Sequence, residues 1–355
     1  MKAKFKLRET RSSPDIRKMP LVVILGPTAS GKSALGVALA KKFNGEVVSA
    51  DSRQIYRGLD IGTGKIAKRE MMGVPHHLLD VISPKQNLSA ETYRRKALTV
   101  IKNILRRGRL PFLVGGTGFY IDAVAGGISF PIVPQNSKLR RRLNKLSAVT
   151  LYKLLKKKDS ARAKTIDPKN PRRLIRALEI IEATKKPIAP ITISAPYDTI
   201  LIAIQRTPQA LRRRILRAVL RRIDRGLLTE TKHLIRSGMS KKRLAGLSIG
   251  YRSAIERLDG KISQAQLIEK CVAGEWQYAK RQITWLRRYP DINPVTTGNS
   301  VPLRRGERWN QKSPAEAMTL KLGCNGVNWI KNKTEAAELI KNFLNRDQKA
   351  VPRKR

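Results

Sequence analysis

The chain has 355 residues, of which 41% are apolar, so it can bury a core and is not disordered by composition. Its 74 lysine and arginine residues exceed its 26 acidic residues and give a formal net charge of +48, which favours nucleic acid as the partner. The two cysteines and three histidines lack the spacing of a metal site, and no apolar run is long enough to span a membrane. We therefore expect a cytoplasmic protein without a membrane segment, and the basic N-terminus leaves import into an organelle open.

Short apolar runs alternate with segments of helical spacing along the first part of the chain. Such runs are typical of buried parallel strands, and the alternation predicts an α/β fold in which helices flank a parallel sheet. In folds of this class, ligands bind at the carboxyl ends of the strands. The predicted strands are residues 21–25, 46–50, 111–114 and 199–204, and the predicted helices between the first three cover 31–43 and 89–107.

The chain changes character between the third and fourth predicted strands. Residues 138–186 carry 17 lysine and arginine residues against 4 acidic ones and show helical periodicity, which predicts an inserted all-helical domain. Helices resume over residues 208–288, and a short amphipathic helix covers 334–345. The predicted organisation is a basic disordered tail (1–19), a sheet domain in two parts (20–130 and 197–290), the helical insertion (131–196), a linker (291–325), and a C-terminal helix with a basic tail (326–355).

A phosphate-binding loop follows the first predicted strand and opens the first predicted helix. In such a loop, backbone amides at the start of a helix form a concavity for phosphate oxygens. Lys32 would neutralise the terminal phosphate and Ser33 would hold Mg²⁺, which indicates a bound pyrophosphate or triphosphate without specifying the reaction. The loop consists of Gly26, Pro27, Thr28, Ala29, Ser30, Gly31, Lys32 and Ser33.

Two further strand ends carry polar side chains to the same edge of the predicted sheet. Asp51 follows the second strand, and Thr117 follows the third within a glycine-rich segment. Taken alone, Asp51 fits a metal ligand or a helix cap better than a general base. Because three strand ends meet at this edge, we expect them to form one site.

These segments together resemble the tRNA dimethylallyltransferase (isopentenyltransferase) family. The resemblance covers most of residues 20–290, in family order, and VPHHLLD is not shared with ordinary phosphate-loop kinases. It rests on the motifs GPTASGKS, ADSRQIY, DIGTGK, VPHHLLD, LVGGTGFYIDA, PRRLIRALE, IGYR and AKRQITW. The resemblance implies transfer of a dimethylallyl group from dimethylallyl pyrophosphate to N6 of the adenosine that lies 3′-adjacent to the anticodon of tRNA.

The resemblance also implies the roles of individual residues. Asp51 would accept the proton of the attacking amine, and Thr117 would support the leaving group or the amine. The phosphate loop, Arg214 and Mg²⁺ bound at Ser33 would hold the pyrophosphate. No covalent enzyme nucleophile is needed, because preorganised donors around the leaving group stabilise the charge that develops there.

The insertion would bind the anticodon stem-loop largely through phosphate contacts, and the target adenine would leave the base stack to reach Asp51. By themselves, runs of basic residues are usually solvated surfaces, and the resemblance raises them to predicted tRNA contacts. We expect a monomer. The predicted tRNA-binding residues are Asp51, Ser52, Arg53, Gln54, Thr117, Arg140, Arg172, Arg173, Arg176, Ile249, Gly250, Tyr251, Arg252, Lys280, Arg281, Gln282 and Arg287.

The chain departs from the family pattern at a few positions. Ala218 stands where a second arginine is usual, Leu220 occupies the neighbouring acidic position, and Glu275-Trp276 replaces Thr-Arg before the AKRQ run. These changes lie on the phosphate and RNA sides of the predicted site. They therefore concern the affinity for these ligands and the rate, rather than the class of reaction. Residues 291–325 also depart from the family, and no role for them follows.

Several alternatives remain open from the sequence. A phosphate-loop kinase would use the same loop and Asp51, and a prenyltransferase could act on free adenine nucleotides. A non-catalytic RNA-binding protein is a third possibility, which the presence of Lys32, Ser33, Asp51 and Thr117 disfavours. His76 and His77 are expected to organise a loop beside the sheet, since no carboxylate partner is identifiable. Tyr278 and Trp285 fit base stacking and helix packing equally well.

Overall fold

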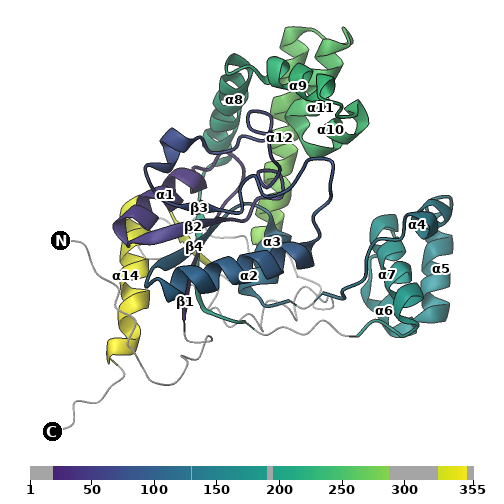
Figure 1. Cartoon of the computed structure of the whole chain (residues 1–355), viewed down its shortest axis with the longest axis horizontal. Helices are drawn as coiled ribbons and strands as arrows, with labels where there is room; N and C mark the ends of the chain where they lie inside the picture. Colours follow the sequence, from purple (N-terminus) through teal and green to yellow (C-terminus); the bar gives the residue numbers. More distant parts are fainter. Residues whose placement is uncertain (1–18, 129, 190–194, 288–326, 350–355) are drawn as a thin grey trace. The chain divides into compact units, whose positions relative to one another are not determined.

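The computed structural model describes residues 19–128, 130–189, 195–287 and 327–349, with side chains up to residue 345. These residues form two compact units (Figure 1). The first unit contains 19–127, 195–287 and 327–349, and the second contains 128 and 130–189. The predicted linker, the predicted tail before Met19 and the final basic residues lie outside the described residues.

A six-stranded parallel sheet with the order β3-β2-β4-β1-β5-β6 forms the centre of the first unit. Every residue of the two central strands β1 and β4 is buried, as is usual for parallel strands covered on both faces. The predicted α/β fold is therefore confirmed. The strands are β1 (Pro20–Leu25), β2 (Gly45–Ser49), β3 (His76–His77), β4 (Leu110–Val114), β5 (Asp198–Ile204) and β6 (Val327–Ile330).

Helices cover both faces of this sheet (Figure 1). The helices α1 (Lys32–Lys42) and α14 (Lys333–Lys349) share one apolar cluster with alternate residues of the strands. The helices α2 (Ala90–Arg106) and α3 (Gly118–Ala125) contact β2, β4 and β1, so their buried side chains meet the opposite face. A short 3₁₀ helix, η2 (Lys68–Met71), lies between β2 and β3.

The edge strands β3 and β6 were not predicted from the sequence. β3 has only two residues, too few to show alternation, and β6 directly follows the segment assigned as a linker. The expectation for the histidines is also wrong, because both lie in a strand that pairs with β2. His77 does have a carboxylate partner: its Nε2 lies 2.6 Å from Oε2 of Glu46, which also accepts a hydrogen bond from Arg107.

A helical group completes the first unit and packs around its own apolar core. The longest of the described helices, α12, begins at a capping box formed by Ser263 and Gln266, and its far end contacts α3 beside the sheet. α12 therefore connects the helical group with the carboxyl ends of the strands (Figure 1). The helices are α8 (Pro208–Asp224), α9 (Leu227–Arg236), α10 (Lys241–Leu247), α11 (Ile249–Leu258) and α12 (Gln264–Leu286).

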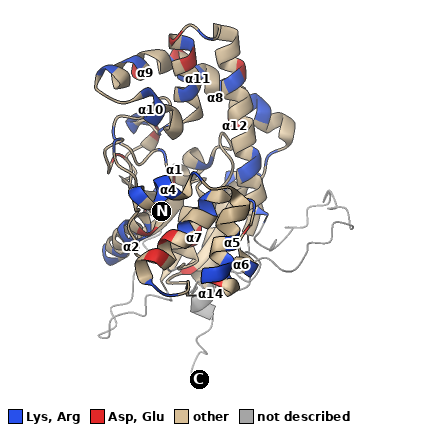
Figure 2. Ribbon diagram, turned by 90° about the vertical axis from the view of Figure 1, so that its right-hand side faces the viewer, with Lys and Arg blue, Asp and Glu red and all other residues tan. Residues whose placement is uncertain are grey.

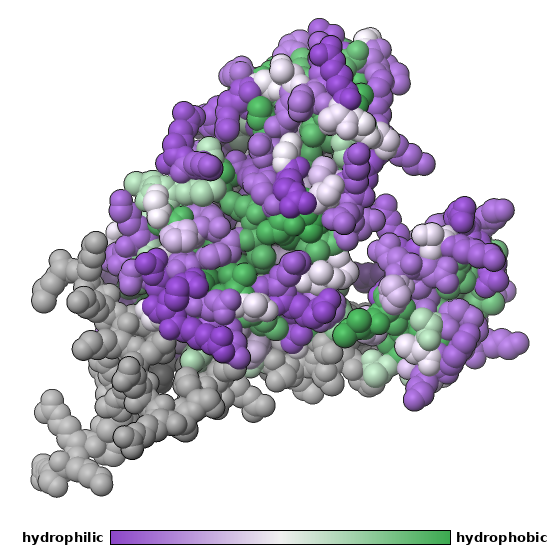
Figure 3. All heavy atoms as spheres, in the orientation of Figure 1, coloured by the Kyte–Doolittle hydropathy of each residue, from purple (hydrophilic) through white to green (hydrophobic). Residues whose placement is uncertain are grey.

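The second unit is helical throughout its regular structure and strongly basic (Figure 2). Each of its helices begins at a side-chain cap, from Asn136, Ser147, Asp159 and Asn170, and Leu151, Leu155 and Leu174 lie fully buried in its core. None of the described helices of the protein is long and apolar enough to cross a membrane, and hydrophilic side chains cover much of the face in Figure 3. The helices are α4 (Ser137–Leu143), α5 (Ala148–Lys158), α6 (Ser160–Thr165) and α7 (Pro171–Thr184).

A buried carboxylate joins α4 to α7 inside the second unit. The side chain of Glu179 is 1% exposed and receives hydrogen bonds from Arg140, from Arg176 and from the backbone N–H of Asn136. Burial opposes the ionisation of Glu179, but these donors outweigh it and lower its pKa to about 2. Two of the predicted tRNA-binding arginines are therefore engaged in holding the fold of the insertion.

We expect Glu179→Gln to destabilise the second unit by about 3 kcal/mol, because two arginines would lose a buried partner. Because folding lowers the pKa, the carboxylate stabilises the fold above the pKa of an unfolded glutamate, about 4.3. This contribution is lost as the pH falls toward about 2. Thermal unfolding at several pH values measures this contribution to stability. The control is Glu182→Gln, at an exposed ion pair, which should change the stability little. Equal effects of the two substitutions would contradict the assignment.

Candidate functional site

The phosphate loop joins β1 to α1 at the carboxyl edge of the sheet. Gly31 has a φ of 101°, in the left-handed region that favours glycine, and it begins α1. The Ser30 N–H donates to the carbonyl oxygen of Pro27 at 3.2 Å and closes the turn. The Ser30 hydroxyl is buried without a hydrogen-bond partner among the described residues. A buried free hydroxyl at the start of a helix is suited to an anionic ligand.

Two cationic side chains lie at this loop, one from within it and one from α8. Lys32 donates to the carbonyl oxygen of Pro27 at 3.3 Å, and Arg214 of α8 donates through Nε to the carbonyl oxygen of Ala29 at 2.7 Å. Burial lowers the pKa of Lys32, while the charges of Asp51 and Glu275 raise it and oppose this effect. The structure thus places the predicted catalytic arginine at the predicted phosphate site.

Asp51 and Thr117 meet because β2 and β4 are neighbours in the sheet. Oδ1 of Asp51 accepts hydrogen bonds from the N–H groups of Arg53 and Gln54, at 2.8 and 3.4 Å. The Thr117 hydroxyl accepts from the Ser52 N–H at 3.0 Å and lies 3.3 Å from the Ser52 hydroxyl. The structure therefore brings the predicted threonine against the turn that begins at the predicted base.

Gly115 permits this close approach of the two strand ends. A Cβ at Gly115 would lie 2.2 Å from the carbonyl oxygen of Ala50, the residue before Asp51. Any larger residue at Gly115 would push the ends of β2 and β4 apart and so move Asp51 away from Thr117. The position therefore favours glycine.

One face of α12 lies against the phosphate loop and the end of β4. Oε1 of Gln282 accepts from the Thr28 N–H at 2.7 Å, and its Nε2 donates to the carbonyl oxygen of Gly116 at 2.9 Å. Two turns earlier, Glu275 accepts a hydrogen bond from the Thr28 hydroxyl at 3.0 Å. Between them, Tyr278 lies beside Thr117, and burial together with the charge of Asp51 raises its pKa. α12 is therefore a wall of the site.

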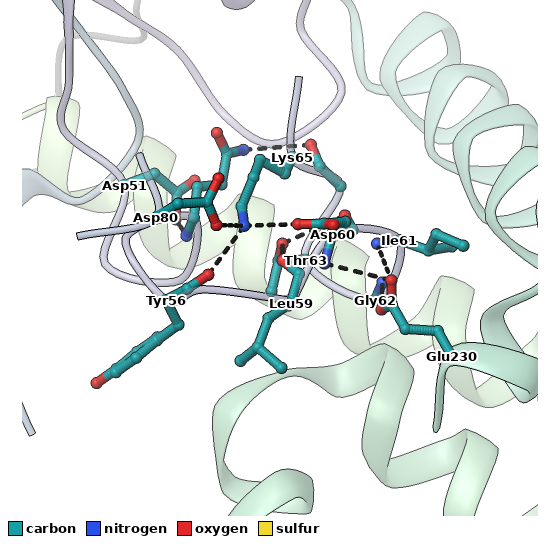
Figure 4. Close-up of polar contacts among 12 residues, drawn as sticks. Asp51, Tyr56, Leu59, Asp60, Ile61, Gly62, Thr63, Lys65, Asp80 and Glu230 are labelled. Atoms are coloured by element: carbon teal, nitrogen blue, oxygen red, sulfur yellow. Dashed lines mark hydrogen bonds and ion pairs between the residues drawn. The ribbon is translucent and has the colours of Figure 1, made fainter. Parts of the chain in front are cut away.

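The segment from Asp51 to Lys65 is held by two charged groups, the buried Lys65 and the partly buried Glu230 (Figure 4). Lys65 donates to the Tyr56 carbonyl oxygen at 2.9 Å and to the carboxylates of Asp60 and Asp80 at 2.6 and 2.5 Å. Glu230 of α9 accepts from the N–H groups of residues 60–62 and from the hydroxyl of the fully buried Tyr251.

Gln54 is held by the same segment, because its Nε2 donates to the carbonyl oxygen of Gly64 at 3.2 Å. The two charged groups therefore fix the polar side chains that follow Asp51. Gln54 is a predicted tRNA contact, and its position depends on the segment that Lys65 and Glu230 hold.

The predicted tRNA-binding residues fall into two classes in the structure. Tyr251, Gly250 and Gln282 are buried, and Ile249 is partly buried, so these residues contribute to the interior of the site or its supports. Ser52 and Gln54 are also partly buried, at the turn that holds Asp51. The exposed basic side chains are Arg53, Arg172, Arg173, Arg252, Lys280, Arg281 and Arg287.

A metal ion in this site would depend on few protein ligands. Among the described residues, no group of three histidine, cysteine, aspartate or glutamate side chains could hold a metal. Ser33 is the second residue of α1, next to Lys32. This arrangement fits Mg²⁺, which keeps several waters and binds largely through substrate phosphates.

Sequence reasoning missed several residues that build the site. Glu230 and Arg222 left no local signal, because their partners lie far away in the chain. Lys65 lies in an irregular segment, where no periodic pattern indicates its partners Asp60 and Asp80. Glu275, Tyr278, Gln282 and Trp285 recur at intervals of three and four residues along α12. From the sequence, Gln282 is predicted as a tRNA contact and the roles of Tyr278 and Trp285 stay open, whereas the polar and aromatic face that these residues share at helical spacing indicates a wall.

We expect Glu230→Ala to loosen the segment around Asp60, because three backbone N–H groups and the Tyr251 hydroxyl would lose their acceptor. Hydrogen exchange of residues 54–65 should accelerate by about tenfold or more, since a buried donor such as the Gly62 N–H costs about 1–3 kcal/mol when it loses its acceptor. Glu269→Ala, at an exposed position, is the control. Unchanged exchange in the Glu230 variant would rule out this support.

Comparison with known sequences identifies the relatives of this chain. Residues 54–289 match the family model described as IPP transferase. The tRNA dimethylallyltransferase of Pelotomaculum thermopropionicum is 40% identical over 287 residues, which cover 79% of this chain and 91% of the relative. The tRNA dimethylallyltransferase of Caldanaerobacter subterraneus is 41% identical over 283 residues, covering 77% and 90%.

Solved structures agree with the sequence comparison. The full-length tRNA isopentenylpyrophosphate transferase from Bacillus halodurans has a TM-score of 0.62 and 34% identity, and the match covers 94% of this chain and 99% of that one. A eukaryotic dimethylallyltransferase described as acting on tRNA has a TM-score of 0.65 and 28% identity, with 76% and 70% covered.

Proposed function

The chain belongs to the IPP transferase family, and from this premise we propose that it is a tRNA dimethylallyltransferase. The donor is dimethylallyl pyrophosphate, and the acceptor is N6 of the adenosine 3′-adjacent to the anticodon. The products are the prenylated tRNA and pyrophosphate. The observation that carries the proposal is the meeting of Asp51, Thr117 and the phosphate loop at one edge of the sheet.

Each group then has a part in the transfer. As the bond from N6 to the allylic carbon forms, the bond from that carbon to the pyrophosphate oxygen breaks. Asp51 accepts the proton that leaves the amine. Lys32 and Arg214, which lie at the loop, and the loop amides stabilise the negative charge on the departing pyrophosphate.

Ser33 would hold Mg²⁺ in this proposal, and the ion, when bound, would neutralise part of the pyrophosphate charge. The buried Ser30 hydroxyl supports an anion at the same place, since it has no partner among the described residues. Thr117 keeps Ser52 and the turn after Asp51 in place through its hydroxyl. The protein therefore supplies position and charge rather than a covalent nucleophile.

Exposed basic side chains on each of the two units support a folded RNA as the acceptor. Arg172 and Arg173 begin α7 with exposed side chains, and Arg252, Lys280 and Arg281 are exposed on α11 and α12. Phosphate contacts of this kind position an RNA without reading its sequence. The target base would leave its stack to reach Asp51, and Ser52 and Gln54 would meet it there.

We expect Asp51→Asn to lower the single-turnover rate of prenyl transfer by at least about a hundredfold, because a carboxamide cannot accept the proton. Binding of tRNA should change less than about twofold, since the base acts in the chemical step. Rapid-quench transfer assays with labelled dimethylallyl pyrophosphate and filter binding of tRNA measure the two effects. A variant that retains the wild-type rate would overturn the assignment of Asp51.

We expect Arg173→Ala to weaken tRNA binding and to reduce the slope of log K against log salt by about 0.7 to 0.9, the value for one lost phosphate contact. Arg173→Lys keeps the charge and serves as the matched control. Titrations at several salt concentrations measure the slope. If the alanine variant keeps the wild-type slope, Arg173 belongs to the solvated surface.

A further inference from the structure

A buried carboxylate lies directly against the phosphate loop. Glu275 of α12 is 8% exposed, although α12 faces solvent at many of its other positions. In the family resemblance of the sequence, a neutral threonine stands in place of Glu275. An acidic side chain beside an anion-binding loop in a chain of net charge +48 therefore requires an explanation.

Both carboxylate oxygens of Glu275 are engaged. Oε2 accepts a hydrogen bond from the Thr28 hydroxyl at 3.0 Å, so this hydroxyl is directed to α12. Oε1 lies 2.9 Å from Nη1 of Arg222 on α8, and the side chains of the pair are only 10% and 14% exposed. Arg222 also donates through Nε to the carbonyl oxygen of Ala218 at 3.3 Å. The carboxylate is thus fixed between the loop and one arginine.

The charge of Glu275 reaches the phosphate-binding lysine. Asp51 and Glu275 are the two carboxylates that act on Lys32, and both counter the lowering of its pKa by burial. Any anion in the loop would share Lys32 with these carboxylates. Glu275 therefore repels the ligand that the loop attracts, while Arg222 neutralises part of this repulsion.

We infer that Glu275 is an affinity-setting residue, whose negative charge, moderated by Arg222, weakens the hold of the phosphate loop on pyrophosphate. This inference rests on the proposed function, because pyrophosphate is the product of that reaction. Weaker retention favours release of pyrophosphate after transfer and so frees the loop for the next donor. In this protein, the buried carboxylate of Glu275 thus offsets part of the positive charge at the phosphate loop.

Calorimetric titration of the full-length protein with inorganic pyrophosphate, at fixed Mg²⁺, tests the inference. Glu275→Gln should bind pyrophosphate about tenfold more tightly, since a unit charge near the anion is removed at an effective dielectric constant of about 20. The amide can still accept the hydrogen bond from Thr28. Arg222→Gln should bind more weakly than wild type, because Glu275 would lose its counter-charge.

Glu256→Gln is the matched control, because it removes one negative charge from α11 at an ion pair with Lys270. It should leave the affinity unchanged. Glu275→Thr supplies a second neutral variant, which should also bind more tightly than wild type.

Glu275→Gln and Arg222→Gln are expected to change the affinity for pyrophosphate in opposite directions. A merely structural role of Glu275 would not produce this difference. If Glu275→Gln and Arg222→Gln both weaken binding, Glu275 only holds the loop in shape and the inference is wrong. Unchanged affinity in both neutral variants of Glu275, with thermal unfolding like wild type, overturns it as well. If wild type itself fails to bind pyrophosphate, the proposed function fails, and this result is distinct from the other two.

Discussion

The side-chain amide of Gln282 joins the parts of the protein on which the site depends. It accepts a hydrogen bond from Thr28 in the phosphate loop and donates one to Gly116, the residue before Thr117. A single rigid group thus sets the separation between the phosphate loop and the end of β4. Because α12 packs against α8 and α11, the positions of Arg214 and of the segment held by Glu230 follow from the same connection.

Scarce carboxylates organise a chain that is otherwise strongly basic. Glu46 holds His77 and Arg107 at the edge of the sheet, Glu179 holds two arginines in the insertion, and Glu275 holds Arg222 at the phosphate loop. Each of these carboxylates is buried, where an ion pair is less screened than on the surface. Many other lysine and arginine side chains are exposed, so the fold is neutralised locally while the surface keeps a charge suited to a polyanion.

The fold and the centre of the site could be predicted because their signals are local. Four apolar strands, the phosphate loop and the polar residues after the strands follow from short stretches of sequence, and parallel topology brings them to one edge. The supporting residues could not be predicted in this way. Glu230 contacts residues 60–62, and Glu275 contacts Thr28, across sequence separations that no periodic pattern records. For the same reason, the sequence could not show that Arg140 serves the fold of the insertion, whereas the spacing of Arg176 and Glu179, three residues apart on one helix, does favour an ion pair.

The most direct test of the account offers one enzyme three acceptors. The protein would be incubated with Mg²⁺, labelled dimethylallyl pyrophosphate and equimolar unmodified tRNA, AMP and ATP, and the labelled products would be separated and digested. The account predicts label on an adenosine of the tRNA, next to the anticodon, with little on AMP or ATP. Label mainly on a free nucleotide, or phosphorylation from ATP without prenyl transfer, would contradict it.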